Sequence, residues 1–377
     1  MRLKATALAL LVAVSMVTMA AAPAAATQQA DGEAYSGANI EFQTTGNAVA
    51  DYAVDGNVIV ENVTVQSASE AESSGGLDAG LEATTDIDAA GLELQSQTRA
   101  SATIRSESGA EMETHDNQRG IIQVRADGQS QVVNVNVSGD AESESDERVV
   151  VTKDDGSQGT FIVVGDGEVV VNEEGDVNAD IEQGSQLVYR QYDGERSDDD
   201  ETTERMIQNG TATAEVYVQQ SQEGGEETVA DAVEYGEDTS VEIASASESQ
   251  VNMTVERSQS QGKVILTTVS EAAFENAEDL TVTVDGEAAA QADSYSAVQQ
   301  SAAEGDQPRY YVAQSSSAEA TTDVAIGIDH FSERNVAMQS DGGGGDGGMT
   351  DGDGAGFGPV IALLAVVGTL LAARRHA

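Results

Sequence analysis

The chain has 377 residues, and its 67 acidic and 17 basic side chains give a formal net charge of −50 and a pI near 4.1. It contains no cysteine, which excludes disulfides, thiolate metal sites and an N-terminal lipoprotein cysteine. A strongly negative chain in which only 4% of the residues are aromatic is also a poor nucleic-acid binder.

Residues 1–26 have the pattern of a secretory signal peptide. Arg2 and Lys4 form a charged start, residues 5–20 form an apolar core, and three alanines ending at Ala26 form a small-residue cleavage site. No twin arginine is present, so we expect export by the general secretory route with cleavage after Ala26.

Residues 354–377 form an apolar end segment. Its residues 359–373 carry no charge, and Arg374 and Arg375 follow them. As a helix rising about 1.5 Å per residue, residues 354–373 would span about 30 Å, the thickness of a bilayer core. Because basic residues stay on the cytoplasmic side, the two arginines would place the preceding chain outside the cell. A single uncleaved membrane helix is one prediction for this segment.

The same segment also has the layout of a sorting signal. It follows an acidic spacer, residues 341–353, which contains only glycine, aspartate, methionine and threonine. Gly356-Phe357-Gly358-Pro359, the apolar run and the two-arginine end resemble the PGF-CTERM sorting signal of haloarchaeal surface proteins, with Ala355 where the family has proline. The resemblance implies processing by an archaeosortase-like enzyme and a lipid anchor near the motif, which would leave no membrane helix. We therefore expect the protein on the extracellular face of the cell membrane.

The charge of the body between these end segments suits a salt-rich environment. The end segments hold four of the 17 basic residues and none of the acidic ones, which leaves a net charge of about −54 between them. In ordinary buffer, high net charge with few large apolar residues is typical of disorder. The screening length falls from roughly 30 Å at 0.01 M salt to about 3 Å at 1 M, where surface carboxylates hardly repel one another. We expect a halophilic folded body, with a disordered acidic stalk as the alternative.

Short runs of alternating β-branched residues predict β-strands from residue 39 onward. Asp55-Gly56 and Asp127-Gly128 have the composition of hairpin turns. We group these runs into a predicted β domain of residues 27–142. The expected strands are 39–44, 48–54, 58–65, 121–124 and 132–137.

A second β domain is predicted for residues 143–268. Residues 196–205 are charged throughout and are expected to form a solvated loop. Turns at intervals of about 8 to 15 residues favour antiparallel sandwiches or long meanders, with a β-solenoid as the alternative. The expected strands are 149–151, 161–164, 169–171, 214–218, 241–243, 251–255 and 264–269.

Residues 269–340 are predicted to form a small strand-helix-strand-strand unit. A short helix would begin after Ser270, and a longer one over 287–303 would place a row of small and apolar side chains on one face. The expected strands here are 280–284, 310–312 and 324–328, and the helix face comprises Ala288, Ala292, Tyr295, Val298 and Ala302. The predicted fold class is therefore mainly β, with this unit and one C-terminal membrane helix.

Four Asn-x-Ser/Thr sequons are candidate glycosylation sites: Asn62, Asn136, Asn209 and Asn252. Asn136 and Asn252 lie on the polar face of their predicted strands, and Asn209 lies in an Asn-Gly turn. We expect at least one of them to carry a glycan; the alternative is an ordinary polar strand residue.

The sequence predicts no metal or cofactor site. Asp176, Asn178 and Asp180 match the first three ligand positions of an EF-hand loop, but Ile181 and Leu187 occupy the positions of its glycine and glutamate. Runs of carboxylates such as residues 198–200 and the spacer are expected at most to bridge cations weakly.

No catalytic motif is present around the three histidines, His115, His330 and His376. The first hypothesis is therefore a non-enzymatic cell-surface glycoprotein with a structural, adhesive or shielding role. Its expected partners are the membrane, the processing enzyme, envelope proteins and weakly bound cations. The alternative is a surface-anchored binding module or hydrolase with an unlocated site, and a third hypothesis is a secreted protein that its tail only targets.

Overall fold

A computed structural model of the chain describes residues 32–74, 77, 80–220, 228–274, 277–305, 307–314 and 321–340. These residues are mainly β-strands, arranged in four sheets that we name A to D, and most strand pairs are antiparallel. The prediction of a mainly β, antiparallel, sandwich-like protein is thereby confirmed. In the part that the structure describes, no helix is long and apolar enough to cross a membrane. Ala26, the spacer and the predicted C-terminal segment lie outside it.

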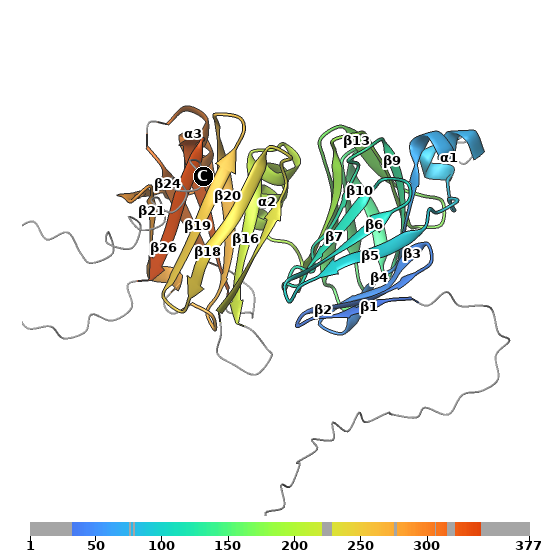
Figure 1. Cartoon of the computed structure of the whole chain (residues 1–377), viewed down its shortest axis with the longest axis horizontal. Helices are drawn as coiled ribbons and strands as arrows, with labels where there is room; N and C mark the ends of the chain where they lie inside the picture. The colour runs from blue at the N-terminus through green and yellow to red at the C-terminus, as the bar shows by residue number, and fades with distance from the viewer. Residues whose placement is uncertain are drawn as a thin grey trace, which may run out of the picture. The chain divides into compact units, whose positions relative to one another are not determined.

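Sheets A and B form the first sandwich (Figure 1, blue to green). Alternate valine, isoleucine and aromatic side chains from both sheets, among them Val63, Ile104 and Phe161, share one buried core. In spatial order, sheet A is β1 (Ala34–Ser36), β2 (Ile40–Thr45), β3 (Ala48–Val54), β4 (Asn57–Ser67), β9 (Gln131–Val137), β14 (Val177–Ile181) and β13 (Gly167–Val171). Sheet B is β10 (Asp140–Ser145), β11 (Arg148–Thr152), β12 (Gln158–Val164), β15 (Gln186–Tyr192), β8 (Ile122–Arg125), β7 (Glu111–His115), β6 (Ser101–Ser106) and β5 (Leu92–Gln97).

Sheets C and D form the second sandwich (Figure 1, yellow to red). Their shared core includes Val216, Met253 and Ile326. Sheet C is β17 (Thr228–Glu234), β16 (Ala212–Gln220), β20 (Gln261–Ser270), β25 (Thr321–His330), β24 (Arg309–Gln314) and β23 (Ala290–Gln291); β16–β20 and β23–β24 are parallel pairs. Sheet D is β18 (Thr239–Ser247), β19 (Gln250–Arg257), β26 (Glu333–Ser340), β21 (Leu280–Val284) and β22 (Glu287–Ala288).

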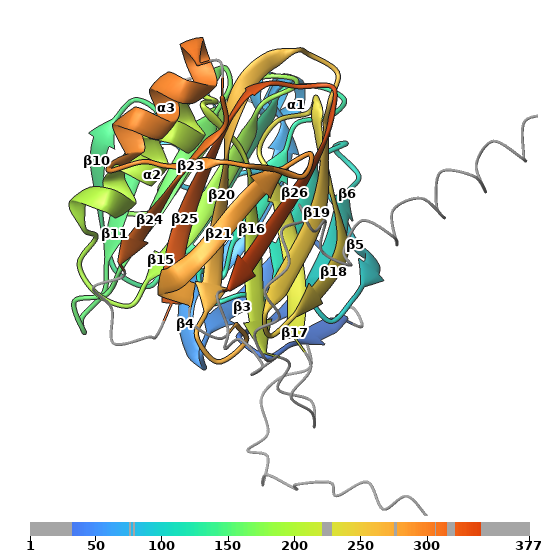
Figure 2. The same ribbon diagram turned by 90° about the vertical axis from the view of Figure 1, so that its left-hand side faces the viewer.

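Helices are few in the described ranges. The α-helices are α1 (Ala68–Ser74), α2 (Asp198–Gln208) and α3 (Tyr295–Glu304), and the 3-10 turns are η1 (Leu81–Ala83) and η2 (Ala277–Asp279). Helix α3 lies against β20, β24 and β25 (Figure 2). Its buried side chains belong to a third apolar cluster that joins sheet B to sheet C, together with Met206 and Ile207 of α2.

The two predicted hairpins have different outcomes. Asp55-Gly56 does connect the antiparallel strands β3 and β4, and both residues have positive φ angles, of 50° and 75°. The hairpin at Asp127-Gly128 is wrong, because β8 belongs to sheet B and β9 to sheet A. At this turn the chain crosses the sandwich instead of folding back beside itself.

The sheets also cross the predicted domain limits. The limit at 142/143 falls inside β10, and sheets A and B both contain strands from either side of it. The limit at 268/269 falls inside β20, and the strands that follow it complete sheets C and D. The strands after residue 269 therefore belong to the second sandwich, not to a unit of their own.

The expected loop at 196–205 is wrong, because most of it is helix α2. Ser197 caps this helix: its Oγ accepts a hydrogen bond from the Asp200 amide at 3.1 Å, and the Asp200 carboxylate accepts one from the Ser197 amide at 2.9 Å. This capping box, together with acidic residues in the first turn, favours helix in a segment chosen as a loop for its charge alone. Glu204, expected in solvent, is fully buried.

The helices expected near the C-terminus are corrected as well. Residues 271–274, after Ser270, form turns, and the longer helix begins at Tyr295 because residues 287–291 form β22 and β23. The predicted helix face is confirmed for Tyr295, Val298 and Ala302, which are buried on α3. Ala292 is buried but precedes the helix, and Ala288 is exposed on β22.

Candidate functional site

Sheets B and C meet through polar side chains. On β7, β8 and β15, one set of alternate residues enters the first core, and the other set faces sheet C. On β16 and β17, alternate residues likewise enter the second core while the others face sheet B. The residues that contact one another across this junction include Gln123, Arg125, Gln186, Arg190, Glu215, Asp231 and Tyr235.

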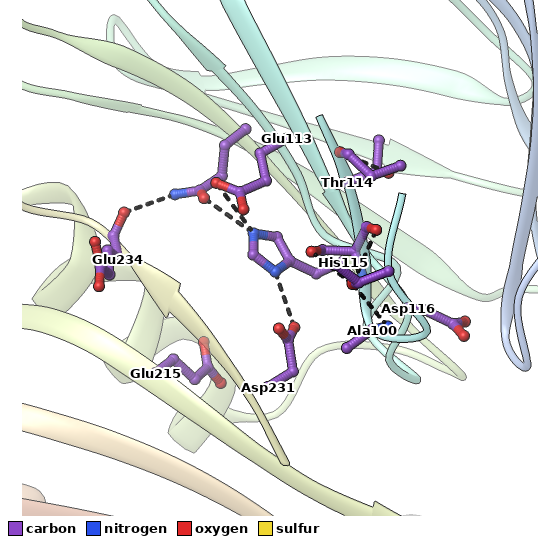
Figure 3. Close-up of polar contacts among 12 residues, drawn as sticks. Ala100, Glu113, Thr114, His115, Asp116, Glu215, Asp231 and Glu234 are labelled. Carbon is purple, nitrogen blue, oxygen red and sulfur yellow. Dashed lines mark hydrogen bonds and ion pairs between the residues drawn. The ribbon is translucent and has the colours of Figure 1, made fainter. Parts of the chain in front are cut away.

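His115, the last residue of β7, lies at the centre of one part of this junction (Figure 3). Its Nδ1 is 2.8 Å from Oδ2 of Asp231 on β17, and its Nε2 is 3.1 Å from Oε1 of Gln123 on β8. The Gln123 amide nitrogen donates to Gln186 Oε1 and to the Glu234 carbonyl, each at 2.9 Å. These two bonds fix the orientation of the amide, so that its oxygen faces the imidazole.

Both ring nitrogens of His115 therefore face oxygen acceptors, an arrangement that suits a doubly protonated imidazolium. Burial by itself lowers the pKa of His115, but the carboxylates of Asp231 and Glu113 and the hydrogen bonds from the ring raise it above its ordinary value. Glu113 Oε2 lies 4.0 Å from Nε2 and also pairs with Arg125 at 3.2 Å. The imidazole is only 1% exposed, so its contacts are with the two sheets and not with solvent.

A second buried charge pair joins Arg190 of β15 to Glu215 of β16. Both side chains are 2% exposed, and the guanidinium donates to both carboxylate oxygens. Tyr235 donates to Glu215 Oε2 at 2.7 Å and accepts from Arg190 at 3.1 Å. Burial raises the pKa of Glu215, but Arg190 and the tyrosine hydroxyls outweigh that effect and hold it below its ordinary value. The two terminal nitrogens of Arg190 and both oxygens of Glu215 are thus hydrogen-bonded, which offsets much of the cost of burying the two charges.

Arg119 extends the charged contacts toward the helices. Its guanidinium lies 4.7 Å from the centre of the Tyr192 ring, 3.4 Å from Asp200 of α2 and 3.6 Å from Asp323 of β25. Asp323 also accepts a hydrogen bond from Thr268 at 2.7 Å. The junction therefore uses cation–π contact as well as ion pairs to hold sheet B, α2 and sheet C together.

Two polar grooves open beside the junction. The larger, of about 730 Å³, is lined by the ends of β8, β12, α2 and β17 and includes Arg125, Asp166, Asn209 and Glu237. The smaller, of about 340 Å³, is lined by Tyr35, Asp116, Gln219 and neighbouring residues. In this second groove the Asp116 carboxylate accepts from the backbone amides of residues 38, 39 and 40, so it is already occupied by the protein's own donors.

The structure separates the four sequons. Asn62 on β4, Asn136 on β9 and Asn252 on β19 are half-buried, whereas Asn209, directly after α2, is exposed. Asn62 and Asn136 are register partners on neighbouring strands. The Asn136 amide donates to Asp176 Oδ2 at 2.6 Å, and that of Asn252 donates to Ser245 at 2.8 Å. The predicted sorting-signal residues Gly356, Phe357, Gly358, Pro359, Arg374 and Arg375 lie outside the described residues, as does Ala26.

In the incomplete EF-hand pattern, Asn178 and Asp180 lie on β14 and Asp176 directly precedes this strand. Asn178 is fully buried: its amide donates to the carbonyls of Leu81 at 2.8 Å and Thr84 at 2.6 Å, and its oxygen accepts from Asn134 at 2.7 Å. Within the described ranges, no group of three acidic or histidine side chains is placed to hold a metal ion. His330 is exposed beside Asp329, at 2.9 Å.

Sequence reasoning missed the junction residues. A signal was available in β15 (Gln186–Tyr192), where an arginine and two glutamines lie in a strand with buried positions on both faces. Such a polar set is typical of a strand between two packed layers. The partners could not have been read from the chain, because Asp231 follows His115 by 116 positions.

No family model and no curated protein matches this chain. Two crystal structures of a heparan sulfate lyase from Pedobacter heparinus have low similarity to it. The mutant enzyme has 12% identity and a TM-score of 0.26, and the match covers 60% of this chain and 41% of the enzyme's. The second structure has 10% identity and a TM-score of 0.24, and the match covers 58% of this chain and 38% of the enzyme's. The chain thus spans less than half the length of these structures, and scores this low carry no argument about fold or activity.

Proposed function

We propose that this chain is a halophilic surface protein, exported and held at the cell envelope by its C-terminal segment, with a structural, adhesive or shielding role. The ends of the sequence support export and anchoring. Adaptation to high salt is supported by where the charged side chains lie in the body of the protein.

The observation that carries the proposal is the use of arginine inside the molecule. At least nine of the eleven arginines between residues 99 and 334 form ion pairs with carboxylates. Arg148, Arg190 and Arg257 are buried, and the Arg196 side chain is 8% exposed, with its guanidinium 2.5 Å from the buried carboxylate of Glu204. Nine arginines, some buried and some at the surface, are thus paired with carboxylates. Because the chain has 67 acidic residues, most of its carboxylates have no arginine partner, which leaves a strongly negative surface. Such a surface needs salt to screen its self-repulsion.

Circular dichroism of residues 27–340 tests the adaptation to salt. We expect a β spectrum in molar KCl that is lost at about 50 mM KCl, where the screening length exceeds 10 Å. Sucrose at matched osmolarity is the control, because it stabilises folded proteins without screening charge. Identical spectra at high and low KCl would contradict the proposal.

Intact-mass analysis of the protein from envelope fractions of its own cells tests the anchoring. The proposal expects the mature chain to begin after Ala26, to have lost Ala377 and to carry a lipid mass. An intact Ala377 in the envelope fraction would identify an uncleaved membrane helix. Recovery of the full precursor in the cytosol would overturn surface anchoring altogether.

The larger groove favours a second candidate, a surface-anchored binding module. Its volume of about 730 Å³ lies within the usual range of ligand pockets, and both sandwiches contribute polar side chains to it. Glycan-array binding of the salt-folded protein, compared with an Asp166→Ala/Glu237→Ala variant, separates the two candidates. Binding that the variant loses would favour a module.

A further inference from the structure

We infer that Asn209 is the preferred glycan acceptor of this chain and that its glycan lies in the neighbouring 730 Å³ groove. This inference rests on the proposed export of the chain, because an Asn-x-Ser/Thr acceptor meets its modifying enzyme outside the cytoplasm. It adds the site, the chemistry and the position of the sugar.

The amide nitrogen of Asn209 is available for reaction. Asn209 is the C-cap residue of α2 and is exposed, and its Oδ1 accepts a hydrogen bond from the Thr211 amide at 2.9 Å. The sequon thus forms a compact turn, in which Gly210 has a φ of 67° and its carbonyl accepts from Lys263 at 2.6 Å. The side-chain oxygen is held in place while the Nδ2 group points to no acceptor within the described residues.

The other three sequons are less accessible. The nitrogens that would form the sugar bond in Asn136 and Asn252 already donate to Asp176 and Ser245. Asn62 is half-buried within β4, which is paired on both sides, and its neighbour across the ladder is Asn136. Side chains opposite one another on adjacent strands are about 5 Å apart, which leaves no room for two sugars.

The modification would be a simple group transfer. A bond forms between Nδ2 of Asn209 and the anomeric carbon of a sugar, while the bond from that carbon to the phosphate of an activated glycosyl phosphate breaks. The amide nitrogen loses a proton to the transferring enzyme's base, and the phosphate leaves with the bonding electron pair. No oxidant or reductant is needed.

The groove next to Asn209 has the chemistry to hold a sugar chain. Gln208, Asn209 and Gly210 form part of its wall, so a glycan on Asn209 begins at its edge. The carboxylates of Asp127, Asp166 and Glu237 and the amide of Gln259 also line it. Carboxylates accept hydrogen bonds from sugar hydroxyls, and the excess of negative charge selects a neutral or amino sugar over a sulfated or uronic one.

Glycopeptide mass spectrometry of the protein purified from its own cells tests the site. We expect occupancy at Asn209 and none at Asn136. A bare Asn209 beside an occupied Asn62, Asn136 or Asn252 would overturn the inference, and so would four bare sequons. Neither result changes the expected lipid mass or the expected dependence of folding on salt. The proposed surface function is therefore tested separately from this inference.

Hydrogen exchange in molar salt tests the position of the glycan. Thr211→Ala removes the sequon but keeps Asn209 and the backbone amide that bonds to it; Thr254→Ala, which removes the Asn252 sequon, is the matched control. We expect several-fold faster exchange at residues 184–186 and 234–239 in Thr211→Ala only. Equal exchange in Thr211→Ala and the unsubstituted protein would show that the glycan extends into solvent, and would overturn its placement in the groove.

Discussion

His115 of β7 and Asp231 of β17 form a buried contact of 2.8 Å between the two sandwiches. The imidazole is 1% exposed, and its other nitrogen faces a glutamine oxygen whose orientation is fixed by its own hydrogen bonds. A histidine with an oxygen acceptor at each ring nitrogen thus joins layers whose strands are far apart in the sequence.

This contact makes stability depend on pH. The pKa of His115 is raised on folding, so its contribution to the free energy of unfolding is complete below the ordinary value near 6.5 and is lost as pH rises through the folded pKa. We expect His115→Gln to destabilise the protein by roughly 1.5–3 kcal/mol at pH 6 and by less at pH 9. Denaturant unfolding in molar salt measures this difference, with His330→Gln as the exposed control. An equal loss at both pH values would contradict a charged His115.

Arg190 and Glu215 should behave as a coupled pair. Arg190→Met leaves Glu215 buried without its counter-charge, and we expect a loss of about 3–5 kcal/mol. Adding Glu215→Leu removes the stranded charge, so the double variant should be more stable than Arg190→Met alone. A double-mutant cycle with chemical denaturation provides the measurement. Simple additivity of the two single losses would mean that the pair is not coupled.

The cap of helix α2 can be tested separately. Ser197→Ala removes the hydroxyl that accepts from the Asp200 amide, and we expect a loss of about 1 kcal/mol. Thr202→Ala, on the surface of the same helix, is the control and should change stability by less than about 0.5 kcal/mol. Thermal unfolding in molar salt compares the two, and similar effects would argue against the capping box.

Asn178 should be structural and unrelated to calcium. Asn178→Ala removes two donated hydrogen bonds and one accepted bond from a fully buried position, with an expected loss of about 1–3 kcal/mol. Asn252→Ala, which loses one donated and one accepted bond at a half-buried position, is the control. Unfolding should be unchanged by calcium or a chelator in the unsubstituted protein. A midpoint shift on calcium addition would restore the metal hypothesis.

Local patterns predicted local structure well. The expected strands 48–54 and 280–284 coincide with β3 and β21, because each is a short alternating run bounded by turn residues. The Asp55-Gly56 hairpin followed from the positive φ angles that these residues tolerate. The strand pairing at the second turn was predicted wrongly. Asp127-Gly128 has the same kind of turn residues, yet the chain there passes from one sheet to the other.

The candidate site could not be predicted from local sequence patterns. An arginine in β15 could have been recognised as a residue between layers, but its partner Glu215 lies on a strand of the other sandwich. Helix α2 was missed because ten charged or polar residues suggested solvent, although Ser197 and Asp200 carry a capping signal. Of the sequons, all four could be found in the sequence, whereas their accessibility depends on hydrogen bonds that only the fold creates.

The parallel pairing of β16 with β20 sets the order in which the second sandwich can assemble. Three strands separate the pair along the chain, one in sheet C and two in sheet D, so β16 acquires this neighbour only after the chain has passed through both layers. The last two strands, β25 and β26, then insert between others and not at a margin. A nascent chain emerging from its N-terminus can therefore complete sheet C only once β25, which ends at His330, is free, and sheet D only once β26, which ends at Ser340, is free. Because these strand pairs join distant parts of the sequence, this half is expected to fold slowly.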